Sequence, residues 1–160
     1  MGTHFKGKAG EVRALDAFIK LMRASEALTV LLQRRLHLEQ LTENQFGVLE
    51  ALLHLGPMCQ SELGRKIFTS GANVTLLIDQ LEKRSLVRRV RTESDRRFVQ
   101  VQLSEEGRNF IKRLFPCHAT AIAQAFGALT AAEQAELGRL CKKLGTHTSA
   151  VVHQAALLLP

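Results

Sequence analysis

The densest group of side chains that could do chemistry lies between Lys83 and Arg97, and it is strongly basic. Seven basic and two acidic residues fall in this stretch, leaving +5 of the chain's net charge of +7. The basic residues are Lys83, Arg84, Arg88, Arg89, Arg91, Arg96 and Arg97. On one surface such a cluster neutralises phosphate groups, and the alternative is a solvated basic face without a partner. The elements that position the cluster decide between these two interpretations.

A predicted helix with an uncharged first turn precedes the cluster. Apolar residues recur along it with helical spacing, namely Val74, Leu77, Ile78 and Leu81. Its first turn and the N-cap before it carry the residues that we expect to approach DNA, which are Ser70, Gly71, Ala72, Asn73 and Thr75. Asn73 and Thr75 should reach base edges in the major groove, whereas the backbone at Ser70 should approach phosphate, unless Ser70 is only a cap.

The neighbours of this helix complete a known arrangement. A short helix is predicted from Gln60 to about Phe68, and only two residues separate it from the next helix, as in a helix-turn-helix. After Leu86 the period changes to two, which predicts strands at 87–91 and 99–103 joined by a charged turn. The unit is therefore a winged helix-turn-helix, and phosphate binding is the better interpretation of its charge.

The rest of the chain is predicted to be helical, which gives a mainly α fold with a small β-hairpin. A long helix is expected at 11–38, and a capping box that starts at Thr42 opens another, which Gly56-Pro57 ends. Ser104 should cap a helix that runs toward Phe126 and that Pro116 should kink or break. A second capping box, at Thr130, should open a last helix that Gly145 closes.

Composition argues against several classes of protein. The chain is 46% hydrophobic, enough for a core, yet it lacks an apolar run of 18 residues and the apolar centre of a signal peptide. Three widely spaced cysteines suggest no disulfide framework and fit a reducing cytoplasm. The six histidines form no tight cluster, so neither a metal nor another cofactor is expected. Motifs of enzymes are also missing, including a Gly-rich phosphate loop and G-x-S-x-G.

The sequence resembles the MarR family of bacterial transcription regulators over about residues 11–145. The resemblance is carried by residues 70–75, by Leu81–Arg89 and by the wing signature, whose matching positions are Asp95, Arg97, Val99, Val101, Leu103 and Gly107. Ser104 stands where the family has Thr, and Ser85 where it usually has Gly. If position 85 is left-handed, the serine there has a modest strain cost.

The resemblance implies a homodimer that binds double-stranded DNA at a pseudo-palindromic operator and performs no catalysis. It divides the chain into an arm (1–10), a dimerisation helix (11–40), the DNA-binding lobe (41–104) and C-terminal dimerisation helices (105–160). It also implies a small anionic or aromatic effector between the dimer interface and the lobe. Residues suited to line that site are Met22, His37, Phe46, Leu49 and Leu53, all equally suited to a core.

The wing supplies the other expected DNA contacts. Arg97 should enter the minor groove, held by Asp95 across the turn, and the alternative is an exposed ion pair of little consequence. The remaining arginines of the hairpin should neutralise phosphates or form internal pairs, and these are Arg88, Arg89, Arg91 and Arg96.

Cys59 offers a second functional hypothesis. It occupies the capping position ahead of Glu62, and a thiol at a helix N-terminus can be reactive. The chain could therefore be a thiol-based oxidant sensor, although a small, half-buried packing cysteine is the preferred interpretation of this position. The leading hypothesis is a repressor released by an effector, and a sequence-blind architectural DNA-binding protein is a further alternative.

Overall fold

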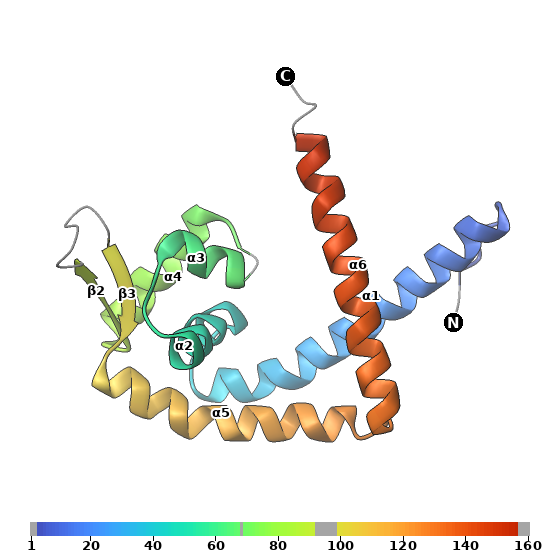
Figure 1. Cartoon of the computed structure of the whole chain (residues 1–160). Helices are drawn as coiled ribbons and strands as arrows, with labels where there is room; N and C mark the ends of the chain where they lie inside the picture. Colours follow the sequence, from blue (N-terminus) through green and yellow to red (C-terminus); the bar gives the residue numbers. More distant parts are fainter. Residues whose placement is uncertain (1–2, 68, 92–98, 157–160) are drawn as a thin grey trace. The chain divides into compact units, whose positions relative to one another are not determined.

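The computed structural model describes residues 3–67, 69–91 and 99–156. Along this part of the chain the elements are α1 (Ala9–Leu38), α2 (Glu43–Leu55), β1 (Met58–Cys59), α3 (Gln60–Lys66), α4 (Gly71–Lys83), β2 (Val87–Arg91), β3 (Val99–Leu103), α5 (Glu105–Phe126) and α6 (Ala131–Ala156) (Figure 1). The chain divides into two compact units, residues 1–121 and 122–160, so that α5 contributes to both. The predicted mainly α fold with a hairpin is confirmed.

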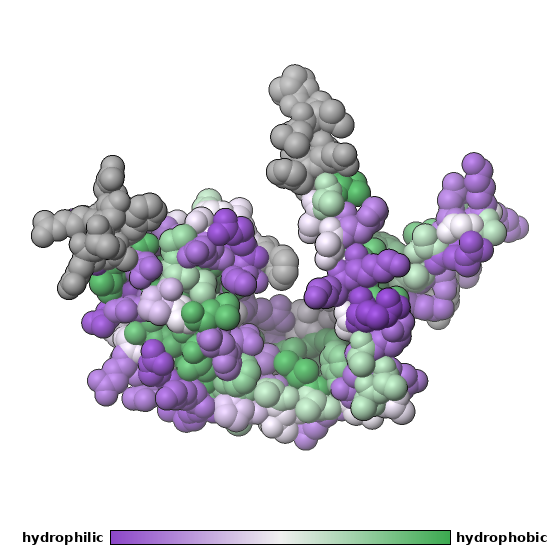
Figure 2. Space-filling view, in the orientation of Figure 1, coloured by the Kyte–Doolittle hydropathy of each residue, from purple (hydrophilic) through white to green (hydrophobic). Residues whose placement is uncertain are grey.

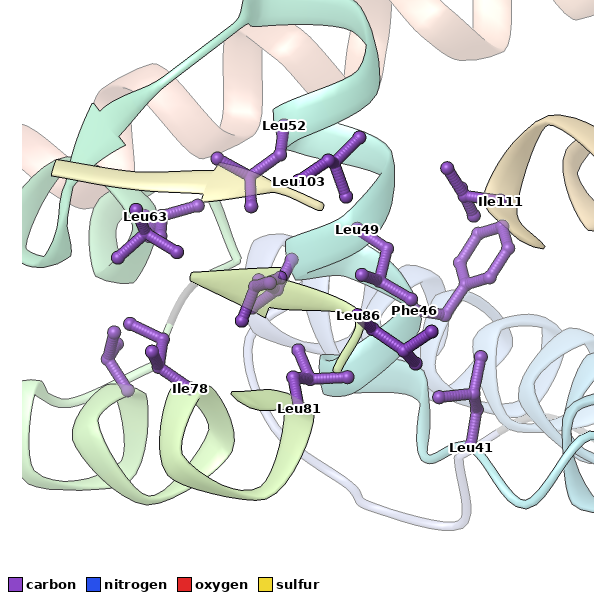
Figure 3. Close-up of a cluster of buried hydrophobic side chains, with 14 of the residues drawn as sticks. Leu41, Phe46, Leu49, Leu52, Leu63, Ile78, Leu81, Leu86, Leu103 and Ile111 are labelled. Carbon is purple, nitrogen blue, oxygen red and sulfur yellow. The ribbon is translucent and has the colours of Figure 1, made fainter. Parts of the chain in front are cut away.

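One hydrophobic core holds the first unit together. Val74, Ile78 and Leu81 of α4 are fully buried, and they pack with apolar residues of α2, the sheet and α5. Figure 3 shows Ile78 and Leu81 pointing from α4 toward the side chains of α2 and the strands. The apolar face predicted from helical spacing is therefore the face that the fold buries.

The start of α2 is fixed by the predicted capping box. Thr42 Oγ1 accepts a hydrogen bond from the Gln45 backbone N–H at 3.2 Å, and Gln45 Oε1 accepts one from the Thr42 N–H at 3.0 Å. Gln45 is itself buried, and its side-chain nitrogen donates to Gln80 of α4 at 2.9 Å. One residue thus caps α2 and joins it to α4.

The hairpin belongs to a three-stranded sheet in the order β1-β3-β2. The sequence predicts β2 and β3 correctly, but β1 was not predicted. Met58 pairs with Val101 and Cys59 with Gln100, both antiparallel. A strand of two residues has too few positions to show a period, and only its distant partner β3 defines it.

The link from α4 to β2 is tightly fitted. Ser85 has φ of +56°, so the left-handed conformation considered from the sequence is confirmed, with its strain cost for a non-glycine residue. Ser104 Oγ donates to the Ser85 carbonyl and accepts from the Gly107 N–H at 2.8 Å, as a helix cap should. A Cβ on Gly107 would lie 1.8 Å from the Leu86 carbonyl oxygen, which only glycine avoids.

The break considered at Pro116 does not occur, and the helix end predicted at Gly145 is wrong. α5 continues through Pro116, because both Lys112 and Pro116 are exposed and the carbonyl that proline leaves unpaired can bond to water. α6 continues past Gly145 to Ala156, since a glycine within a helix costs only about 1 kcal/mol. Smaller differences are the start of α1, two residues before Glu11, and the end of α3 at Lys66.

Large apolar side chains remain exposed on α1 and on α6 in the single chain. On α1, Phe18 is 57% exposed and Met22 is 51% exposed, and on α6 Leu144 is 53% exposed. Green apolar surface is interspersed with purple polar surface in the space-filling view (Figure 2). Exposed apolar side chains along two long helices are typical of surfaces that another chain covers.

We expect Gly107→Ala to lower the free energy of unfolding by roughly 1–3 kcal/mol, because the new methyl group meets the rigid Leu86 carbonyl. Gly138→Ala is the control, since a Cβ there has no described atom within 4 Å. Within α6 this control should be neutral or stabilise by about 0.5–1 kcal/mol. Urea unfolding followed by circular dichroism measures both, and equal midpoints for wild type and Gly107→Ala would contradict the close approach.

Candidate nucleic-acid interface

The first turn of α4 presents the predicted reading residues at the surface. Ser70 caps the helix by accepting a hydrogen bond from the Asn73 N–H at 3.5 Å. The predicted residues here are all exposed, namely Ser70, Gly71, Ala72, Asn73 and Thr75. A shallow hollow beside them, lined from α3 and α4, includes Arg65 and Gly71. Free N–H groups of a helix start and a nearby arginine suit a phosphate at this edge.

Two of these polar side chains are partly engaged within the lobe. The Thr75 hydroxyl donates to the Gly71 carbonyl at 3.2 Å, and Asn73 Nδ2 donates to Thr69 Oγ1 at 3.4 Å. Asn73 keeps its amide oxygen and a second amide hydrogen for a base edge. Thr75, in contrast, offers its methyl group and lone pairs, which makes it the poorer donor.

The wing arginines do not share one role. Arg88 and Arg91 are exposed on β2, and Arg88 faces its cross-strand neighbour Gln102 on β3, whose amide oxygen can accept from Arg88 Nε at 2.7 Å. Their expected contacts with phosphates stay predictions. The remaining predicted wing contacts lie outside the described residues and stay predictions, and these are Asp95, Arg96 and Arg97.

Arg89 joins the wing to α4. Its guanidinium pairs with Asp79 at 2.6 Å and with Glu82, and its backbone N–H donates to Glu82 at 3.0 Å. Burial lowers the pKa of Arg89, but the hydrogen bonds to the two carboxylates outweigh it and raise the pKa above its usual value. Of the two roles that the sequence left open, the structure favours the internal pair.

Arg84 is a second arginine that the fold uses internally. Its guanidinium donates to the Gln40 carbonyl at 2.6 Å and to the Glu39 carbonyl at 3.1 Å, at the end of α1. Gln40 has φ of +53°, so the chain turns sharply here and leaves carbonyls in need of donors. Both bonds join parts of the chain more than forty residues apart, which periodicity does not reveal.

The expected effector residues are not gathered in one place. Phe46 and Leu49 are sealed in the core, and Leu53 packs against it, whereas Met22 and His37 are exposed on α1. The structure instead draws attention to His118 of α5, which sequence reasoning did not select.

His118 contacts Phe46, with ring centroids 4.1 Å apart, and its Nδ1 is buried without a hydrogen-bond partner among the described residues. Burial lowers the pKa of His118, against the opposite influence of Glu50 and Glu43, so the ring is neutral near pH 7. A second contact between α2 and α5 lies at the edge-to-face rings of His54 and Phe115, 4.6 Å apart.

Cys59 lies at the start of α3, as predicted, and is half-buried. Its N–H donates to Glu62 at 2.9 Å, and its Sγ lies 3.1 Å from Ser61 Oγ. The hydrogen bonds from Cys59 lower the pKa of Glu62 below its usual value. Among the described residues, no group of three or more His, Cys, Asp or Glu side chains could hold a metal ion.

We expect Arg89→Ala to lower the free energy of unfolding by roughly 1–2 kcal/mol, because Asp79 and Glu82 lose their shared cation at partial solvent exposure. The matched control is Arg91→Ala, which removes an exposed arginine from the same strand and should change stability by less than about 0.5 kcal/mol. Urea unfolding at low and high salt measures both. Equal stability of the two variants would show that the ion pairs contribute nothing.

Comparison with known proteins identifies the family. The MarR family model matches residues 41–99. The HTH-type transcriptional regulator YkoM of Bacillus subtilis is 36% identical over 104 residues, 65% of this chain and 68% of that protein. The HTH-type transcriptional repressor NicR of Pseudomonas putida is 31% identical over 124 residues, 78% of each chain.

A solved structure agrees with these relatives. The Bordetella bronchiseptica protein BpsR, whose DNA binding is regulated by 6-hydroxynicotinic acid, superposes with a TM-score of 0.73 at 27% identity, covering 81% of this chain and 98% of its own. No helix in the described part of this chain has the length and apolar character needed to span a membrane. The chain belongs to the MarR family and is a winged helix-turn-helix transcriptional regulator that binds double-stranded DNA.

Proposed function

We propose that this regulator is a homodimeric repressor that binds a pseudo-palindromic operator and is released by a small aromatic effector. The observation that supports DNA reading most directly is the uncharged, exposed first turn of α4, flanked by exposed basic residues of the wing. Like the relatives named above, it would act in transcription and not as an enzyme, in the cytoplasm where its DNA lies.

The homodimer is supported by the apolar residues that α1 and α6 each leave exposed. Leu140 and Leu144 recur one turn apart on α6, 47% and 53% exposed, and Phe18 and Met22 do the same on α1. A self-complementary interface would cover them and give the dimer two-fold symmetry. Two-fold symmetry in turn requires a pseudo-palindromic operator whose half-sites lie about one helical turn apart, on the order of 34–36 Å.

The effector is assigned to the contact between α2 and α5 around His118. A neutral imidazole with a buried, unpartnered Nδ1 leaves a polar group unsatisfied, which a ligand hydroxyl or carboxyl group can satisfy. Phe46 contacts the His118 ring, and Phe115 lies three residues before His118 on the same helix. The DNA binding of the related protein BpsR is regulated by 6-hydroxynicotinic acid, which is an aromatic acid with a hydroxyl group. This relationship supports an aromatic acid as the class of ligand.

Thiol-based sensing at Cys59 is the weaker alternative. The half-buried Cys59 is accounted for by its place in β1 and at the cap of α3. We therefore expect operator binding to be insensitive to peroxide.

For DNA reading, we expect Asn73→Ala and Arg97→Ala to differ. Loss of Asn73 should cost roughly 1–3 kcal/mol per half-site and relax one base position, because an amide reads a base edge. Loss of Arg97 should weaken binding to most sequences. It should also reduce the salt slope, which is the steepness with which the logarithm of the binding constant falls with the logarithm of the salt concentration, by about one per wing. Titrations of operator variants at several salt concentrations measure both.

The control for the salt slope is Arg139→Ala. Arg139 lies on α6 and pairs with Glu136 at 2.7 Å, so its removal should leave the slope unchanged. An unaltered salt slope in Arg97→Ala would show that Arg97 does not contact DNA. Unchanged base preferences in Asn73→Ala would show that Asn73 does not read a base.

For the effector, we expect His118→Phe to bind operator like wild type but to resist release by aromatic acids. Phenylalanine keeps a ring against Phe46 and removes both ring nitrogens, so the effector loses a hydrogen bond worth about 1–2 kcal/mol, roughly tenfold in affinity. The measurement is release of a labelled operator by 6-hydroxynicotinic acid and by salicylate. Equal release of wild type and His118→Phe would move the effector elsewhere, and no release of either would argue against an aromatic effector.

A further inference from the structure

Leu76 is an apolar residue in an unexpected place. It lies in the middle of α4 and is 57% exposed, although the other large apolar residues of this helix are buried or half-buried. Single exposed leucines are common on protein surfaces and need no explanation by themselves. The position of Leu76 does need an explanation, because α4 is the helix that this fold inserts into the major groove.

The rotation of α4 places Leu76 at the centre of its outward surface. Val74, Ile78 and Leu81 are completely buried and define the inward side. At 100° per residue, Ala72 and Leu76 lie nearly opposite that side. Both are exposed, so the surface of α4 farthest from the core is apolar over its first two turns.

Two of the polar residues beside Leu76 are engaged elsewhere. The Thr75 hydroxyl donates back to Gly71 at 3.2 Å, and the Asp79 carboxylate is paired with Arg89 at 2.6 Å. The centre of the outward surface therefore has little to offer a base by hydrogen bonding. Lys83, Arg88 and Arg91 are exposed nearby on the helix end and the wing, which favours nucleic acid over an apolar protein partner.

We propose that Leu76, with Ala72 beside it, selects a thymine in each half-site by contact with the thymine C5-methyl group. The proposal rests on the operator binding proposed above. In the major groove that methyl group is the apolar feature of the base edges, and every other distinguishing group is a hydrogen-bond donor or acceptor. An apolar side chain therefore discriminates best at a thymine, and it disfavours bases whose polar edges it would cover without satisfying them.

The test removes the methyl group from the DNA and the side chain from the protein. An operator is first selected from a random duplex pool with the purified full-length protein, and each thymine is then replaced in turn by deoxyuridine, which lacks only the methyl group. At one thymine per half-site, wild type should bind about fourfold more weakly after replacement, and about sixteenfold when both half-sites are changed, as expected for about 0.8 kcal/mol per buried methyl group. Leu76→Ala should bind both forms of that operator alike.

Leu55→Ala is the matched control. Leu55 has the same exposed fraction, 57%, and lies at the end of α2, so its variant should keep the full sensitivity to deoxyuridine. Sensitivity that persists in Leu76→Ala, or a scan in which no thymine matters to wild type, would overturn the role of Leu76 while leaving operator binding intact. Failure to enrich any sequence would overturn sequence-specific binding itself, and the role of Leu76 with it.

Discussion

The rotation of α4 about its own axis is the constraint on which the DNA-reading surface depends. Val74, Ile78 and Leu81 are sealed in the core, and turning the helix would expose them and bury Asp79 or Lys83, at a cost of several kcal/mol. Gln45 from α2 and Arg89 from β2 hold the same helix from two further sides. Packing therefore decides which residues face the groove, whatever their own polarity.

Some basic side chains of the cluster at residues 83–97 are paired within the fold. The sequence alone suggests that they are available to DNA. Arg84 satisfies the carbonyls at the end of α1, and Arg89 neutralises Asp79 and Glu82. Each of these arginines already has partners at short distance, so a phosphate would have to compete with them. The salt dependence of operator binding should follow exposed side chains such as Arg88 and Arg91, and not the total count of basic residues.

Local signals accounted for most of the fold. Thr42 with Gln45, Ser70 and the alternating residues of β3 each form structure through neighbours close in sequence, and the structure confirms them. The misses depend on distant partners or on solvent. β1 exists because Val101 and Gln100 pair with it, and α5 tolerates Pro116 because that side of the helix is wet. Local sequence carries neither fact.

The site followed the same division. Residues 70–75 could be placed at an exposed helix start, because a helix start after a tight turn is a local pattern. Sequence reasoning did not select Leu76, because an apolar residue is assigned to the core by its type. Only the packed helix shows that Leu76 faces outward. Sequence reasoning did not select His118, because its neighbour Phe46 lies 72 positions away in sequence. The buried, unpartnered Nδ1 becomes visible only once the two residues are in contact.

The contact of His118 with Phe46 also gives the proposed effector a physical route to DNA. Phe46 is 3% exposed and belongs to the same core cluster as Ile78 and Leu81, the residues that set the rotation of α4. A ligand that displaces the Phe46 ring must repack that cluster, because close-packed cores shift between discrete arrangements. The coupling is reciprocal, so operator DNA must weaken effector binding by the factor by which the effector weakens DNA binding. Repression and release are then two consequences of one packed contact.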